Sequence, residues 1–240
     1  MRISIEIDGV AVEADDGENL VDAAAAAGAY IPTLCYRAGH PALGTCRVCT
    51  VSVDGRETAA CTVSVHDGMR VQVSDSGLTD GRRAVIEMLF AEGNHNCPSC
   101  EKSGRCTLQA VAYDVEMTVS RFPYQFPRRT NDSASKRIWL ERDRCIFCQR
   151  CVELVRDRDT GKKIFAIDGR GSTARIDIDT QLADAMPSDQ IRDAVELCPV
   201  GAILEKAVGF DEPIGQRRFD VASIRQQTLD EHRGDHSGST

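Results

Sequence analysis

The sequence predicts an α+β protein made of several small domains, and three observations lead to this. Residues 1–77 hold short runs in which apolar and polar side chains alternate, as in β-strands. Residues 78–120 hold two stretches with the apolar spacing of helices. Eleven cysteines fall into three groups and one isolated position further along the chain. Such grouping indicates domains built around shared ligand sites.

Composition and charge exclude several classes of protein. The 240-residue chain has a formal net charge of −8, which argues against nucleic acid as a main partner because phosphate binding needs a basic surface. No run of 18 apolar residues is present, so we expect no membrane span. The first residues alternate like a strand and lack the charged and apolar regions of a secretory signal. We therefore expect a cytoplasmic protein.

The number of cysteines points to metal ligands. In a reducing compartment, clustered cysteines are more often ligands than disulfide partners. Eleven is an odd number, which opposes a disulfide scaffold, the weakest of the alternatives. One histidine added to eleven cysteines gives twelve ligands, which is three sets of four.

Residues 1–77 are expected to form a sheet with one helix. Residues 3–12 alternate around a turn at Asp8-Gly9, which predicts a hairpin. Asn19 is a candidate cap for a helix through the alanines of 23–27, with Gly28 as its stop. A strand at 51–53 and a turn at Asp54-Gly55 follow.

Four cysteines in this region have the spacing C-x10-C-x2-C-x11-C. They are Cys35, Cys46, Cys49 and Cys61, and we expect Cys61 to open a further strand. Two bridged irons need four thiolates, which favours a [2Fe–2S] site. Gly44 suits a loop whose backbone N–H groups approach the sulfides. A zinc site ranks below this because zinc sites usually pair two C-x2-C motifs and this region has one.

Residues 78–120 place a histidine beside three cysteines. Helical spacing at 79–92 and again from Leu108 to Val115 predicts two helices with a loop between them. The loop holds His95, Cys97, Cys100 and Cys106. A lone histidine usually has a minor role, but the C-x2-C-x5-C triplet lacks a local fourth ligand, which favours His95 as that ligand. A zinc site with three cysteines and one histidine is the alternative.

Residues 138–210 have half of a two-cluster ferredoxin pattern, after a proline-containing connector at 121–137. Such ferredoxins have two C-x2-C-x2-C-x3-C-P runs, and the fourth cysteine of each run binds the other cluster. This chain keeps the four positions of one cluster and lacks those of the other. The retained positions are Cys145, Cys148, Cys151 and Cys198, and the lost positions are Val155, Ser188, Ile191 and Ala194. One [4Fe–4S] cluster is therefore expected, with a hairpin inserted at 164–179.

The C-terminal tail, residues 211–240, contains no cysteine. Its last part, 230–240, is polar and rich in Gly and Ser, so we expect disorder or loose docking there.

Three segments resemble the small iron–sulfur (diaphorase) subunit of soluble NAD-reducing [NiFe] hydrogenases. They are YIPTLCYRAGHPALGTCRVC, LFAEGNHNCPSCEKSGRC and IWLERDRCIFCQRCVE. The chain is similar more broadly to the N-terminal part of the complex I peripheral-arm iron–sulfur subunit and to the accessory domain of [FeFe]-hydrogenases. Those two groups usually have H-x3-C, whereas His95 and Cys97 form H-x-C, as in the soluble hydrogenases. The complex I subunit also continues into a large further domain, whereas this sequence ends at 240.

The resemblance implies three domains with one cluster each. The first is a β-grasp [2Fe–2S] domain, the second a helical domain whose [4Fe–4S] cluster has one histidine and three cysteine ligands, and the third a degenerate two-[4Fe–4S] ferredoxin domain. The implied ligands are Cys35, Cys46, Cys49 and Cys61; then His95, Cys97, Cys100 and Cys106; then Cys145, Cys148, Cys151 and Cys198.

The implied function is electron relay within an NAD-reducing hydrogenase, with no substrate site on this chain. The implied partners are an FMN-containing, NAD(H)-binding subunit and the small and large [NiFe] hydrogenase subunits. One alternative is the iron–sulfur subunit of another NADH-linked oxidoreductase, such as a complex I-like enzyme or a formate dehydrogenase. A zinc-stabilised interaction module is a second alternative.

Overall fold

The computed structural model describes residues 1–235, which divide into two compact units. Unit 1 comprises Met1–Glu87, Ala110–Arg121 and the chain from Ala222 onward, and unit 2 comprises Met88–Gln109 and Phe122–Val221. The division passes through the helices α2 (Ser76–Glu92) and α3 (Thr107–Asp114). It therefore differs from the sequence boundaries at 77 and 120, which stay predictions.

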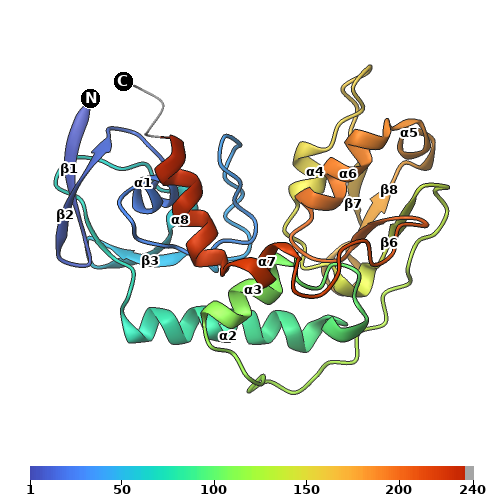
Figure 1. The fold of residues 1–240 in the computed structure, drawn as a ribbon, viewed down its shortest axis with the longest axis horizontal. Coiled ribbons are helices and arrows are strands. Elements are labelled where there is room, and N and C mark those ends of the chain that lie inside the picture. Colours follow the sequence, from blue (N-terminus) through green and yellow to red (C-terminus); the bar gives the residue numbers. More distant parts are fainter. Residues whose placement is uncertain (236–240) are drawn as a thin grey trace. The chain divides into compact units, whose positions relative to one another are not determined.

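Unit 1 contains a mixed five-stranded sheet in the order β2-β1-β5-β3-β4 (Figure 1). The predicted hairpin at 3–12 is confirmed, because β1 and β2 pair antiparallel. The turn at Asp54-Gly55 likewise joins the antiparallel strands β3 and β4, while β5 runs parallel to β1. The strands are β1 (Arg2–Ile7), β2 (Val10–Asp15), β3 (Thr50–Val53), β4 (Arg56–Ala59) and β5 (Arg70–Gln72).

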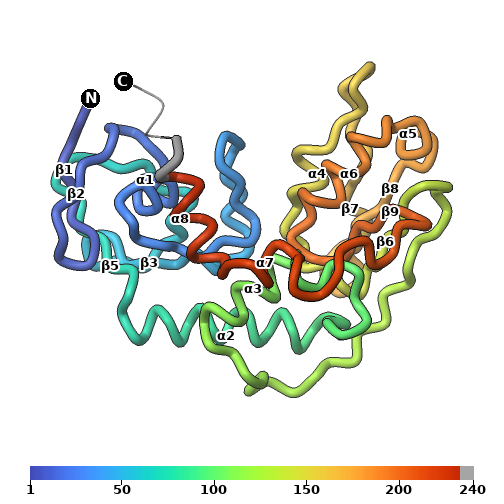
Figure 2. Tube along the Cα trace, in the orientation of Figure 1, coloured from blue at the N-terminus to red at the C-terminus, as the bar shows by residue number. Residues whose placement is uncertain are grey.

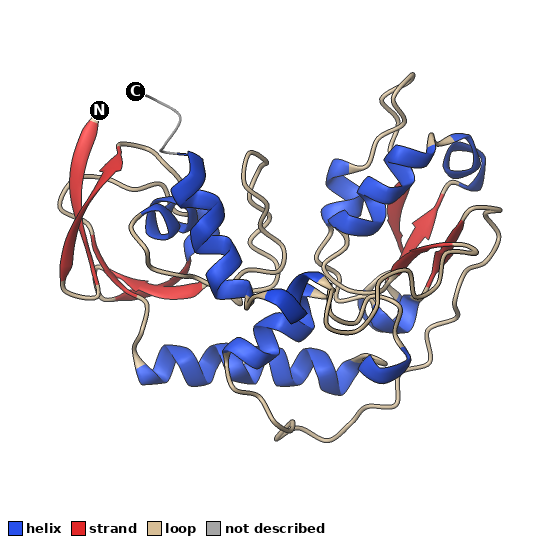
Figure 3. Ribbon diagram, in the orientation of Figure 1, coloured by secondary structure: helices blue, strands red, loops and turns tan. Residues whose placement is uncertain are grey.

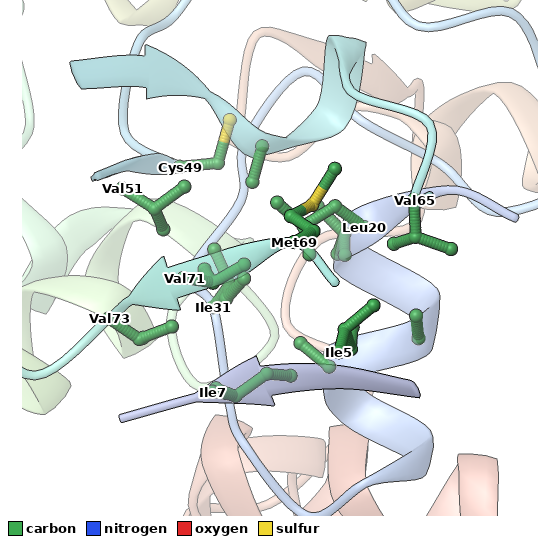
Figure 4. Packing of buried hydrophobic residues seen from close by; sticks show 14 of the residues in the cluster. Ile5, Ile7, Leu20, Ile31, Cys49, Val51, Val65, Met69, Val71 and Val73 are labelled. Atoms are coloured by element: carbon green, nitrogen blue, oxygen red, sulfur yellow. The ribbon is translucent and has the colours of Figure 1, made fainter. Parts of the chain in front are cut away.

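Helix α1 (Leu20–Ala26) packs its buried side chains against the sheet to complete the core of unit 1. The Asn19 side chain accepts a hydrogen bond from the Val21 amide, so the predicted cap is confirmed. One face of β1 points Ile3, Ile5 and Ile7 into a cluster that includes Leu20. Figure 4 shows side chains of this cluster packed with those of β3 and β5. The core ends at Cys49 and Cys61, which are themselves buried in it.

The C-terminal segment contains two helices. Helix α7 (Arg218–Val221) is followed by α8 (Ile224–Asp235), which packs against α1 (Figure 2). Arg225 lies 2.9 Å from Asp114 and over the ring of Tyr30. Disorder or loose docking is expected from the sequence for 230–240; residues 230–235 continue helix α8, and 236–240 lie outside the described residues.

Unit 2 contains two small sheets with helices beside them (Figure 3). The predicted hairpin is confirmed, since β7 (Phe165–Asp168) and β8 (Arg175–Ile178) pair antiparallel. In the second sheet β6 (Ile138–Leu140) pairs with β9 (Ile203–Glu205). The helices include α4 (Arg150–Leu154), α5 (Thr180–Ala185) and α6 (Ser188–Leu197), and 3-10 turns occur at η2 (Cys97–Ser99), η3 (Arg142–Arg144) and η4 (Gly171–Thr173).

Within residues 1–235, none of the helices combines the length and the apolar character that crossing a membrane requires.

Candidate iron–sulfur sites

The four cysteines of unit 1 meet at one end of its core. Cys35, Cys49 and Cys61 are almost fully buried. Hydrogen bonds from the thiols of Cys46 and Cys61 lower the pKa of Cys35. A hydrogen bond from the Cys61 thiol also lowers the pKa of Cys49. The four sulfurs are therefore one connected group, as the spacing predicts.

One local prediction here is wrong, since Cys61 does not open a strand. It lies in the 3-10 turn η1 (Ala60–Thr62) that follows β4. The Ala60 amide donates to the Cys49 carbonyl, and the Thr62 hydroxyl donates to the Ala59 carbonyl. These bonds tighten the chain after β4 and bring Cys61 beside Cys49.

The loop of unit 1 has backbone geometry suited to enclosing a cluster. Gly44 has φ +63°, and a Cβ there would lie 2.9 Å from the Thr62 methyl carbon, so a side chain does not fit. Arg47, between two of the cysteines, has φ +61°. Left-handed backbone in a short loop can turn neighbouring N–H groups toward one point, which favours a negatively charged group.

In unit 2, His95, Cys97, Cys100 and Cys106 line one cavity together with Phe90, Leu108, Arg144 and Gly201. The His95 Nε2 atom is buried in the described structure without a hydrogen-bond partner. Burial lowers the pKa of His95 to about 4, so its imidazole is neutral at neutral pH and free to donate a lone pair. A buried imidazole without a hydrogen-bond partner, in the wall of a cavity that three thiols also line, fits a cluster with these four ligands.

Cys145, Cys148, Cys151 and Cys198 line a second cavity in unit 2, with apolar walls that include Ile146, Ile176 and Val200. Cys198 is thus brought to the C-x2-C-x2-C loop from the far end of α6. Burial raises the pKa of Cys145 to about 11 and that of Cys148 to about 12, a cost that a bound metal offsets because it binds the thiolates.

Backbone amides lie within hydrogen-bond distance of a cysteine sulfur in each set of unit 2. The Phe147 amide lies 3.4 Å from Cys145 Sγ, and the Gln109 amide lies 3.4 Å from Cys106 Sγ. Phe147 and Gln149 have φ +51° and +62°. Amide bonds to sulfur are one of the means by which proteins set cluster potentials.

Apolar side chains occupy three of the four positions at which the ferredoxin repeat would place a second cluster. Val155, Ile191 and Ala194 are 6%, 0% and 1% exposed, and Ile164 nearby is fully buried. Ser188 differs, since it lies exposed at the start of α6. Hydrophobic packing therefore holds α4 against α6 where a two-cluster protein would have a cofactor.

The two ligand sets of unit 2 share a short segment, residues 198–201. The sulfur of Cys106 is 3.5 Å from the Pro199 carbonyl oxygen. A Cβ on Gly201 would lie 2.8 Å from the sulfur of Cys100. Ligands of the histidine-containing set thus contact the backbone directly after Cys198, a contact that the sequence spacing does not predict.

Across residues 1–235 no group of three or more His, Cys, Asp or Glu side chains is arranged as a site for a metal ion. The sets in unit 2 instead surround cavities. Sequence reasoning missed Arg144, which shares the cavity of His95; a long-range contact of this kind leaves no spacing pattern.

Comparison with known proteins identifies the family. Three family models match: a 2Fe-2S iron-sulfur cluster binding domain at residues 1–76, the NADH-ubiquinone oxidoreductase-G iron-sulfur binding region at 82–121, and the ferredoxin-like domain of NADH-quinone oxidoreductase subunit 3 at 135–204. The mitochondrial NADH-ubiquinone oxidoreductase 78 kDa subunit of Candida albicans is 30% identical over 87% of this chain, which spans 29% of that relative.

Two relatives match along almost their full length. A chain in the crystal structure of an NAD+-reducing [NiFe]-hydrogenase in the H2-reduced state superposes with a TM-score of 0.86 at 39% identity, covering 96% of this chain and 98% of that one. The gamma subunit of the NAD-reducing hydrogenase HoxS of Cupriavidus necator is 60% identical over 96% of this chain and 98% of its own length. The chain therefore belongs to the family of iron–sulfur subunits of NAD-reducing hydrogenases.

Proposed function

We propose that this chain transfers electrons through three iron–sulfur clusters as a subunit of an NAD-reducing [NiFe] hydrogenase. The observation that supports it most is in unit 2, where two four-ligand sets contact the same segment, residues 198–201. Cys198 belongs to this segment, and Cys100 and Cys106 of the other set lie against it, so clusters held by the two sets would be neighbours.

The ligand assignment follows the geometry of each set. Cys35, Cys46, Cys49 and Cys61 would hold a [2Fe–2S] cluster in a β-grasp domain. His95, Cys97, Cys100 and Cys106 would hold one [4Fe–4S] cluster, and Cys145, Cys148, Cys151 and Cys198 would hold the other. When bound, the clusters supply one-electron redox chemistry; the protein supplies ligands, burial and amide bonds to sulfur, which set the potentials.

The partners are proposed from the relatives. We assign an FMN- and NAD(H)-binding subunit to one end of the relay and the small and large [NiFe] hydrogenase subunits to the other. The clustered cysteines also fit a reducing compartment, so we propose a cytoplasmic location.

Metal and sulfide analysis of anaerobically purified protein tests the proposal. One two-iron and two four-iron clusters amount to about ten irons per chain with as many sulfides. EPR of the reduced protein should show cluster signals that titrate one electron at a time. Stoichiometric zinc without sulfide would instead support an interaction module and contradict the relay. Identification of co-purifying subunits distinguishes a hydrogenase from a complex I-like or formate-linked enzyme.

A further inference from the structure

Two arginines separated by one residue line different ligand cavities in unit 2. Arg142 lines the cavity of Cys145, Cys148, Cys151 and Cys198, and Arg144 lines the cavity of His95 and its three cysteines. Both side chains are well buried, at 9% and 13% exposure. Burial of a guanidinium costs free energy unless negative charge lies close by, so the counter-charges of the two arginines are informative.

The charge of Arg142 is fully balanced by carboxylates. Its Nη2 atom is 2.7 Å from Asp132 and 2.8 Å from Asp177. Its remaining nitrogens donate to the carbonyls of Ile176 and Thr130. Arg142 therefore joins three segments of the chain, its own, residues 130–132 and residues 176–177, and two carboxylates surround its one guanidinium.

The charge of Arg144 is balanced differently. Within the described chain it pairs with one carboxylate, that of Glu101 at 2.9 Å, which is 32% exposed to solvent. The same nitrogen, Nη1, lies 3.4 Å from the Gly201 carbonyl. The guanidinium therefore stands between a solvent-screened carboxylate on one side and the cavity on the other.

We propose that Arg144 raises the reduction potential of the cluster bound by His95, Cys97, Cys100 and Cys106, with Glu101 moderating that effect. The inference rests on the proposed function, because it assumes that this set holds a cluster. Reduction adds one negative charge, and a fixed positive charge in the cavity wall stabilises the reduced form. The neutral imidazole of His95 acts in the same direction, because it replaces a thiolate.

The effect is expected to be selective for one cluster. Arg144 lines the histidine-containing cavity, whereas the cavity of Cys145, Cys148, Cys151 and Cys198 has Arg142 in the corresponding role. Arg144 thus has one ion-pair partner, with Glu141 as a further nearby carboxylate, whereas Arg142 has two ion-pair partners. The four-cysteine set also has the buried Arg150 beside Cys148. The charge of Arg144 and the neutral ligand His95 both favour the reduced form of the histidine-containing cluster.

The test is a redox titration followed by EPR on the complete cofactor-loaded complex, with the signal of the histidine set identified by its change in a His95→Cys variant. Arg144→Gln should lower that midpoint by at least a tenfold change in the reduction constant, which is about 59 mV for one electron. Arg144→Lys, which keeps the charge, should stay nearer to wild type. Glu101→Gln should move the midpoint upward.

A matched control is Arg105→Gln. Arg105 lies in the same loop and is 17% exposed, but its guanidinium pairs with Asp211 at 2.8 Å and Glu212 at 3.3 Å. Both [4Fe–4S] midpoints should be unchanged in this variant.

An unchanged midpoint in Arg144→Gln at full iron content overturns the inference, and so does an equal shift of both four-iron clusters. If Arg144→Gln loses iron, Glu101→Gln decides: a higher midpoint supports the inference and an unchanged or lower one overturns it. Absence of four-iron signals in the wild-type complex would instead contradict the proposed function.

Discussion

The sulfur of Cys106 lies 3.5 Å from the carbonyl oxygen of Pro199, the residue that follows Cys198. The amide of Leu108 donates to the same oxygen at 3.3 Å. The loop that presents the histidine-containing set is therefore fastened to the chain that presents the last ligand of the other set. Substitutions in residues 198–201 should affect both sets, to different degrees.

Gly201→Ala should reduce occupancy of the histidine-containing set. A Cβ at this position would be 2.8 Å from Cys100 Sγ and 3.2 Å from Lys102 Cβ, so the ligand must shift. Iron and sulfide content should fall toward that of a chain lacking one four-iron cluster. Gly81→Ala is the control: in α2 a Cβ meets nothing within 4 Å, and the change should stabilise by up to about 1 kcal/mol without loss of iron. Full iron content in Gly201→Ala would contradict the packing argument.

Cys198→Ala should abolish the four-iron cluster of the Cys145 loop, despite a separation of about fifty residues in sequence. Cys198 is 7% exposed and lines the same cavity as the other three cysteines. The measurement is EPR of the reduced protein together with iron content. Ser188→Ala, at an exposed position of the lost cluster, should leave both unchanged. An intact four-iron signal in Cys198→Ala would disprove the ligand assignment.

His95→Cys should keep a four-iron cluster and lower its midpoint. A thiolate makes the cluster one charge more negative than neutral imidazole does, so reduction becomes harder. Within the described residues, His95 Nε2 is buried without a hydrogen-bond partner, which is consistent with the proposed histidine ligation. An EPR-monitored titration with an unchanged midpoint and unchanged signal shape would argue against histidine ligation.

Arg82→Met should destabilise unit 1. The buried guanidinium of Arg82 donates to the Thr50 carbonyl at 2.7 and 3.0 Å and to the Val73 carbonyl at 2.8 Å, which joins α2 to the strands beside Cys49. Loss of these charged hydrogen bonds should cost about 2–4 kcal/mol. Thermal melts followed by visible absorbance measure the effect. Arg56→Met, at an exposed position in β4, should change stability by less than about 0.5 kcal/mol; equal losses in the two variants would contradict the assigned role.

Features coded by nearby residues were predictable from the sequence. The Asn19 cap and the hairpins at 3–12 and 164–179 depend on local turn and capping chemistry, and the structure has all of them. The convergence of His95 with three cysteines was predictable for a different reason, since an incomplete ligand triplet demands a fourth donor. Cys198 was predictable because the ferredoxin repeat fixes its partners.

Features decided by contacts between distant segments were not predictable. Cys61 lies in a 3-10 turn that hydrogen bonds to the carbonyls of Cys49 and Ala59 stabilise. This turn forms in place of the strand that the local sequence pattern favours. The left-handed backbone at Arg47 and Phe147 could not be predicted, because neither residue is a glycine. The ordered helix α8 depends on Arg225 reaching Asp114 and Tyr30, residues more than a hundred positions earlier.

The apolar filling of the lost site has a consequence for how the protein matures. Val155, Ile191 and Ala194 give the region around α4 and α6 a nucleus of side chains that needs no inorganic component. Before iron and sulfide are delivered, this nucleus should keep the Cys145 loop and Cys198 on scaffolds already docked to each other. Iron and sulfide would then enter a site whose four cysteines are already close to their final positions. Assembly of a cluster in this set would then depend less on the order in which the chain and its metal arrive.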